Sequence, residues 1–162
     1  MKILVLYPHP LEPDGVSIQG DMLYKGLLHA GVNAIPCHFR ESIQKEFYLR
    51  HFKPDLALGI GFWGNVPEII RTPLKWGVTP VPWFNADGWV ANYQTEFNQL
   101  RLMFTTSEWV RQIYKRDKVD VSKIVPAHIG IDTDLFKPLN NLEMNLTIKR
   151  MFGVRDNEKM IL

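Results

Sequence analysis

Short apolar runs alternate with turns and helical patterns along most of this chain. Apolar runs of strand length occur at 3–7, 32–37, 54–60, 78–84, 102–105 and 124–129. Patterns with helical spacing follow three of these runs, at 17–29, 66–75 and 108–115. Such alternation is typical of βαβ units, whose strands run parallel within one sheet. The sequence therefore predicts an α/β domain with a mainly parallel sheet of about six strands.

Single residues indicate where some of these elements end. Gly31 stands where a C′ glycine would close the helix predicted at 17–29. Pro36 cannot donate to a strand ladder, so the run at 32–37 is expected near an edge of the sheet. Ser107 is placed to cap the helix predicted at 108–115. The stretch 40–50 is polar, and we assign no element to it.

Composition excludes several classes of protein. The chain has 162 residues, a net charge of +2 and one cysteine, Cys37. This charge gives no electrostatic case for nucleic-acid binding, and a single cysteine forms no internal disulfide. No apolar run approaches the ~20 residues that span a bilayer, and Pro8 ends the first run below signal-peptide length. We expect a cytoplasmic protein that is at most peripheral to a membrane.

The pattern of the sequence changes after Pro138, where the alternation of apolar runs and helical patterns is interrupted. Residues 139–142 are typical of a linker, 146–152 of a short helix, and 159–162 begin another apolar strand. A strand at a terminus needs neighbours, which favours a natural protein that continues. We therefore expect one domain at 1–138, followed at 139–162 by a linker and the beginning of a truncated second domain.

The most specific motif spans 129–138, Ile-Gly-Ile-Asp-Thr-Asp-Leu-Phe-Lys-Pro. Gly130 permits a sharp reversal of the backbone, and Asp132 can accept hydrogen bonds from the amides that follow it. Phe136 is expected to be a buried anchor. The motif resembles G-[VI]-D-x-x-x-F-x-P, the signature that closes the N-terminal domain of family-four glycosyltransferases. The opening Met-Lys-Ile-Leu strand and Phe-Thr-Thr-Ser-Glu-Trp-Val at 104–110 agree with the same family.

The resemblance implies a GT-B architecture, in which this chain is a Rossmann-like, three-layer N-terminal domain. It implies the acceptor-binding half of a retaining, hexosyltransferase-type enzyme, inactive by itself. A nucleotide-sugar donor would be bound mainly by the missing C-terminal domain, and the acceptor would be a sugar, a lipid-linked group or a small molecule. The chain departs from the family at three places. His128-Ile129 replaces Pro-Asn before the signature glycine, and Gly15 is a single glycine where the first loop often carries two. Asn85-Ala86-Asp87 follows the fourth strand, where the family frequently has a histidine.

Ligands of open α/β sheets bind beyond the carboxyl ends of the strands, and this rule selects the candidate site residues. Asp87 and His9 are the catalytic candidates, because a carboxylate or an imidazole there can move a proton. Each has a structural alternative: Asp87 as a cap on the next helix, and His9 as a histidine held between prolines. His29, His38 and His51 fall outside the predicted strand ends.

The substrate-binding candidates are Gly15, Val16, Ser17, Trp63, Trp89, His128 and Gly130. The first three begin a helix, where free amides favour an anion, although Ser17 is equally suited to cap that helix. Trp63 and Trp89 could stack on a sugar, or Trp63 could fill the core beneath its loop. No G-x-G-x-x-G, Walker or zinc-like spacing occurs, so we predict no metal and no complete nucleotide site in this half.

Two other functions remain open at this stage. A GT-B-shaped nucleotide-sugar epimerase would need an acid and a base that the sequence does not assign. A non-catalytic α/β binding module would need no further domain, so the length of the natural gene product separates it from a transferase.

Overall fold

The computed structural model describes residues 1–138 and 141–159. The chain divides into two compact units, Met1–Gly130 and Ile131–Leu162, and each is described by itself.

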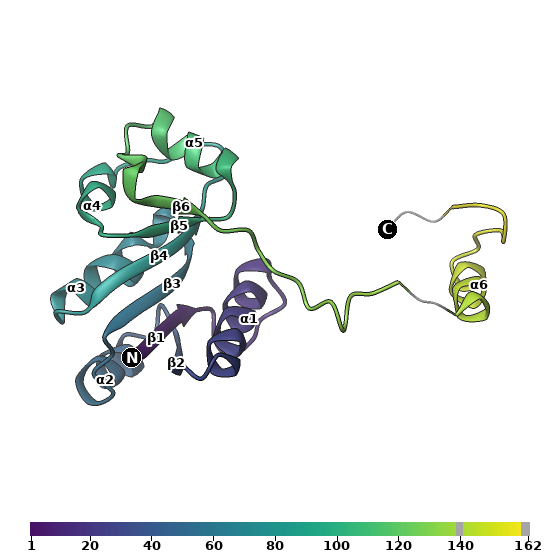
Figure 1. Cartoon of the computed structure of the whole chain (residues 1–162), viewed down its shortest axis with the longest axis horizontal. Coiled ribbons are helices and arrows are strands. Elements are labelled where there is room, and N and C mark those ends of the chain that lie inside the picture. Colours follow the sequence, from purple (N-terminus) through teal and green to yellow (C-terminus); the bar gives the residue numbers. More distant parts are fainter. Residues whose placement is uncertain (139–140, 160–162) are drawn as a thin grey trace. The chain divides into compact units, whose positions relative to one another are not determined.

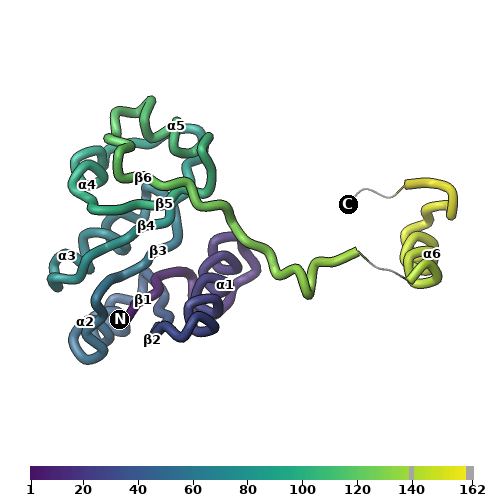
Figure 2. The backbone as a smooth tube through the Cα atoms, viewed as in Figure 1, coloured from purple at the N-terminus to yellow at the C-terminus, as the bar shows by residue number. Residues whose placement is uncertain are grey.

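The first unit is built on a six-stranded sheet in the order β2-β1-β3-β4-β5-β6. All neighbouring strands pair in parallel. The colour change from purple at β1 to green at β6 in Figures 1 and 2 follows this order across the sheet. The strands are β1 Lys2–Tyr7, β2 Asn33–His38, β3 Leu56–Phe62, β4 Thr79–Asn85, β5 Met103–Thr105 and β6 Ile124–Pro126.

Helices connect each strand to the next. They are α1 Gly15–His29, α2 Ser42–His51, the 3₁₀ turn η1 Trp63–Asn65, the π-helical η2 Pro67–Arg71, α3 Thr72–Lys75, α4 Gln94–Gln99, α5 Glu108–Arg116 and the 3₁₀ turn η3 Val121–Lys123. Gly31 closes α1 with a φ of 75°, and the Ser107 hydroxyl accepts from the Val110 amide at the start of α5. Both of these predicted helix ends are confirmed.

The two faces of the sheet are covered unequally. α1 packs Leu23 and Leu27 over Ile3, Val5 and their neighbours on one face. The larger core on the other face is shared by α2, η2, α4 and α5, and Figure 1 shows α1 across the sheet from α2 and α3.

The uncovered part of the α1 face lies over the later strands. Ile60, Trp83, Phe104 and Val125 stand beside one another on β3, β4, β5 and β6. Ile60 is 1% exposed, Trp83 and Phe104 are partly exposed, and Val125 is 46% exposed. Exposure therefore increases with distance from α1.

The predicted α/β class and the parallel sheet are confirmed, and so is the edge position of β2. Some boundaries were wrong. β6 ends at Pro126 rather than residue 129, because β5 offers it only Met103–Thr105 as a ladder. Two helices were not predicted: α2, which begins in the polar stretch 40–50 and ends at His51, and the short α4.

In the second unit, the expected turn at Asp132 is confirmed. Its carboxylate accepts from the amides of Asp134 and Leu135 at 2.9 and 3.1 Å. Phe136 is 61% exposed, so the expectation of a buried anchor was wrong. The turn is held instead by local bonds, including one from the Phe136 amide to the Asp132 carbonyl at 2.7 Å.

Among the described residues of this unit, helix α6 Leu142–Met151 follows and begins four residues before the predicted one. The Asn141 side chain caps it by accepting from the Met144 amide. Residues 139–140 of the expected linker and 160–162 of the expected last strand lie outside the described residues. No helix in the described segments has the length and apolar character that a membrane span requires.

Helix α1 packs closely on the sheet at Gly20, which is buried against Tyr7. A Cβ at this position would lie 2.6 Å from Tyr7 Cδ2, with two other Tyr7 carbons nearer still. At Gly26 of the same helix a Cβ would meet nothing within 4 Å.

We expect Gly20→Ala to lower the free energy of unfolding by about 1–3 kcal/mol, because the new methyl group overpacks the core. The matched variant Gly26→Ala is expected to raise it by about 0.5–1 kcal/mol, since alanine favours the helix. Urea unfolding of both variants measures the difference. Equal effects of the two substitutions would contradict the close packing at Gly20.

Candidate functional site

Loops after β1, β2 and β3 enclose a cavity at the carboxyl edge of the sheet. Its volume is about 280 Å³. We call it the β1–β3 pocket; it is lined by Pro8, Glu12, Asp14, Val16, His38, Phe39, Arg40, Phe62 and Asn65. Ligand pockets measure roughly 300–1,000 Å³, so this one suits a single ring-sized group.

Ser17 holds one wall of this pocket in place. Its hydroxyl donates to the Pro8 carbonyl at 2.6 Å and accepts from the Glu12 amide at 2.8 Å. The residue is fully buried. The sequence predicted Ser17 as a ligand contact, but its hydroxyl is already bonded within the chain and stabilises the loop from Pro8 to Asp14.

Asp14, and not Ser17, is the cap of α1. Its carboxylate accepts from the amides of Val16 and Ser17 at 2.8 and 3.0 Å. The amides that the sequence analysis expected to be free for an anion are thus occupied by a carboxylate of the chain itself. Gly15, the first residue of α1, is exposed, and a Cβ there would meet nothing within 4 Å.

His9 is positioned by the last residue of β1. The Tyr7 hydroxyl lies 3.0 Å from His9 Nδ1, and the two rings meet edge to face with centroids 5.4 Å apart. Burial raises the pKa of Tyr7 to about 12, so the phenol stays protonated and can donate to Nδ1. In that tautomer the His9 Nε2 carries the proton and can donate to a ligand oxygen.

His38 lines the pocket, although the sequence analysis set it aside. β2 extends one residue further than predicted and brings His38 to the carboxyl edge. Its Nδ1 accepts from the Arg40 amide at 3.0 Å, and its Nε2 lies 3.9 Å from a carboxylate oxygen of Glu12. Glu12, Asp14, Arg40 and Asn65 were also missed as pocket residues.

Trp63 and Trp89 lie together beyond the ends of β3 and β4. Their ring centroids are 4.9 Å apart, and the rings are tilted by 56°. Trp63 is partly buried against the core, as one of its two readings expected, whereas Trp89 is 54% exposed. Phe62, which lines the β1–β3 pocket, meets the Trp63 ring edge to face at 5.8 Å.

Asp87 is exposed in the loop after β4. It does not cap the next helix, because the N-cap residue of α4 is Tyr93, which makes no side-chain cap bond. The alternative of Asp87 as a helix cap is therefore excluded. His128 and Gly130 are exposed beyond β6 and line no cavity described here.

The loop around Trp89 is fixed by the end of α5. Arg116 donates to the Gly88 carbonyl at 2.7 Å, and the Val90 amide donates to the Asp117 carboxylate at 2.6 Å. Arg116 also binds that carboxylate, with Nε 2.7 Å from Oδ1. Gly88 has a φ of 87°, a conformation that glycine adopts without strain. We call Arg116 and Asp117 the loop clamp.

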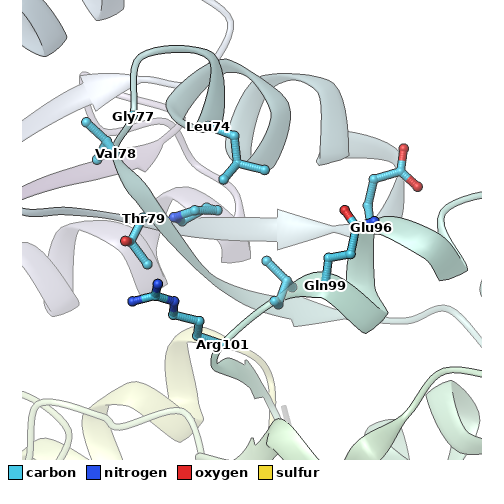
Figure 3. A pocket seen from close by; sticks show the side chains of 9 residues that line it. Leu74, Gly77, Val78, Thr79, Glu96, Gln99 and Arg101 are labelled. Carbon is cyan, nitrogen blue, oxygen red and sulfur yellow. The ribbon is translucent and has the colours of Figure 1, made fainter.

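A second cavity of about 300 Å³ opens near the amino end of β4. Figure 3 shows its side chains, which come from the α3–β4 connection and from α4 and the residues after it. Leu74, Val78, Pro80 and Leu100 give it an apolar lining, with Arg101 beside them. It contains none of the candidate residues, and it lies away from the carboxyl edge where open α/β sheets bind ligands.

Cys37 is poorly suited to act as a nucleophile. Cys37 is buried, and burial raises the pKa of its thiol to about 12, which disfavours the nucleophilic thiolate. Within the described residues no group of three or more His, Cys, Asp or Glu side chains is placed to hold a metal ion. The expectation that the protein uses no metal stays a prediction.

Comparison with solved structures gives a clear match in fold. The chain is similar to Anabaena Alr3699/HepE in complex with UDP and glucose, with a TM-score of 0.64 and 12% identity over 94% of this chain and 50% of that one. The complex of the same protein with UDP-glucose gives a TM-score of 0.65 and 14% identity over the same shares. The chain thus spans half the length of the structures it matches.

At these identities the likeness shows the fold, which is that of a Rossmann-like domain and of half a GT-B structure. The expected architecture is therefore confirmed. No protein-family model matches the sequence. No curated protein matches it either.

The loop clamp predicts a dependence of stability on acid. Arg116 and then the Val90 amide hold the pKa of Asp117 below its ordinary value. A carboxyl whose folded pKa is depressed adds stability above its unfolded pKa, and this is lost as the pH falls through the folded pKa. Asp117→Ala should therefore lower Tm at about pH 7, and the difference from wild type should shrink below about pH 4. Tm differences that stay equal across this range would contradict the charged clamp.

Proposed function

We propose that this chain is the N-terminal, acceptor-side half of a GT-B glycosyltransferase, which moves a sugar from a nucleotide-sugar donor to an acceptor. The observation that carries the proposal is the match, over 94% of the chain, to half of a protein solved with UDP and glucose. The signature at 129–138 supports a relation to family four, and through it a retaining, hexosyl-transferring reaction. The single cysteine supports a location in the cytoplasm.

In this proposal the β1–β3 pocket receives the acceptor. Carboxylates of Glu12 and Asp14 line it, and Asp14 already occupies the helix amides that a diphosphate would need. Arg40 also lines the pocket, so side chains of both charges are present, and with the helix amides occupied the pocket suits a neutral ligand rich in hydroxyl groups. The donor phosphates would then be bound by the second domain.

Two side chains are proposed to act on the reacting groups. Asp87, exposed after β4, would accept a proton from the acceptor hydroxyl or hold a sugar hydroxyl. His9, oriented by Tyr7, would donate a hydrogen bond from Nε2 to a ligand oxygen. No metal takes part in this scheme. The lone glycine of the first loop, Gly15, leaves bare backbone between two pocket residues, Asp14 and Val16.

The proposal predicts turnover by a longer protein that joins this chain to a donor-binding domain, and none by residues 1–162 alone. In the longer protein, Asp87→Asn should lower kcat by about a hundredfold, the usual scale for a general acid or base, with Tm unchanged. Glu46→Gln, an exposed carboxylate on α2, is the matched control and should keep wild-type kcat. Release of nucleotide diphosphate from nucleotide sugars is the measurement. Turnover by residues 1–162, or no transfer by the longer protein with any donor, would overturn the proposal.

We expect Gly15→Val in the longer protein to raise the KM of the acceptor by about tenfold, or about 1.4 kcal/mol of lost binding. Gly15 lies between the pocket residues Asp14 and Val16, and a Cβ at this position meets no atom of the chain within 4 Å, so the fold should persist. Gly15→Ala is the gentler control. If Gly15→Val leaves the KM of both substrates and the rate unchanged, Gly15 only shapes a surface turn.

A further inference from the structure

Three aromatic rings form a continuous path from the β1–β3 pocket onto the surface. Phe62 lines the pocket and is 38% exposed. Its ring meets Trp63 at 5.8 Å, and Trp63 meets Trp89 at 4.9 Å. The path thus ends on Trp89, whose side chain is half exposed. We call these three residues the aromatic path.

Trp89 is exposed but firmly held. The residue before it, Gly88, accepts a hydrogen bond from Arg116, and the residue after it, Val90, is buried and donates to Asp117. The loop clamp therefore fixes the backbone on both sides of the indole, while the ring itself stays open to solvent. An aromatic ring held in this way loses little conformational entropy when it binds a ligand.

Polar groups accompany these rings. The pocket at one end of the path contributes Glu12, His38 and Arg40. The loop at the other end carries the exposed carboxylate of Asp87, two residues before Trp89. Apolar ring faces with hydrogen-bonding groups beside them match a sugar ring, which has C–H groups on its faces and hydroxyls at its edge.

We propose that Phe62, Trp63 and Trp89 are a stacking surface for the sugar rings of an oligosaccharide acceptor, one ring of which enters the β1–β3 pocket. This assignment rests on the proposed glycosyltransferase function and narrows its acceptor to a saccharide. A nucleobase also stacks on aromatic rings, but the amides of Val16 and Ser17 that its phosphates would use are already occupied by the Asp14 carboxylate. Arg116 and Asp117 are positioning residues, because they act on the ligand only through Trp89.

The experiment uses the indole N–H signals of ¹⁵N-labelled residues 1–162, assigned with single Trp→Phe variants. Trisaccharides of glucose, galactose, mannose and N-acetylglucosamine are titrated separately, and UDP alone is a further arm. We expect at least one trisaccharide to shift the signals of Trp63 and Trp89. The signals of Trp76 and Trp83 should stay in place, since the Trp83 indole is bonded to the Ala127 carbonyl and Trp76 packs against the core.

Trp89→Ala should weaken trisaccharide binding at least tenfold, or by about 1.4 kcal/mol, read from the Trp63 signal. The matched control is Trp109→Ala on α5, which removes another exposed tryptophan, 64% exposed, and should change the Kd less than twofold. Asp117→Ala should weaken binding while the Trp89 indole remains, which a purely structural role of the loop clamp would not produce.

Three results would overturn the stacking surface. The first is that neither the Trp63 nor the Trp89 signal shifts with any of the four trisaccharides at about 10 mM, a typical upper bound for specific weak binding. The second is an equal loss of affinity in Trp89→Ala and Trp109→Ala. The third is a shift of the Trp63 and Trp89 signals with UDP alone. Failure here is distinguishable from failure of the proposed function. If the longer protein transfers sugar to a non-saccharide acceptor, the proposed transferase function stands and the stacking surface is wrong. If saccharides bind but no sugar is transferred, the stacking surface stands and the transferase function is wrong.

Discussion

The carboxyl edge of this domain depends on the close contact between α1 and β1. Gly20 lets the helix backbone approach the Tyr7 ring, and one turn earlier Ser17 bonds to the loop at Pro8 and Glu12. Tyr7 in turn orients His9 through its hydroxyl. The packing of a single helix therefore determines the shape of the first loop, one wall of the β1–β3 pocket and the direction of an imidazole.

Much of the fold could be predicted because buried parallel strands are continuous apolar runs, which can be read directly from the order of residues in the sequence. Helix α2 could not be predicted, because its apolar side chains face solvent and a lysine faces the core. Ile43 and Phe47 are 85% and 57% exposed, whereas Lys45 is only 3% exposed. The Lys45 ammonium donates to the carbonyls of Phe39 and Glu68, and burial lowers its pKa. Such a satisfied cation carries no periodic signal, yet it ties a pocket residue, Phe39, to η2.

The candidate site was predictable as an edge of the sheet but less so as individual residues. Asp14 and Ser17 are both good caps, and only the fold decides between them, because the Ser17 hydroxyl faces the carbonyl of Pro8. His38 was missed as a pocket residue because the predicted end of β2 was one residue too early. Trp63 and Trp89 were identified, but their contact depends on β3 and β4 being neighbours and on the loop clamp, neither of which is encoded locally.

The unequal covering of the sheet has a consequence for its dynamics. β1 and β3 are packed on both faces, whereas the α1-side surface of β5 and β6 ends in partly exposed Phe104 and exposed Val125. Local opening costs least where little apolar surface is buried, and β6 is a three-residue edge strand. Amide protons should therefore exchange first at the β5–β6 ladder and last in β1, so that the domain frays from the end leading to the signature motif.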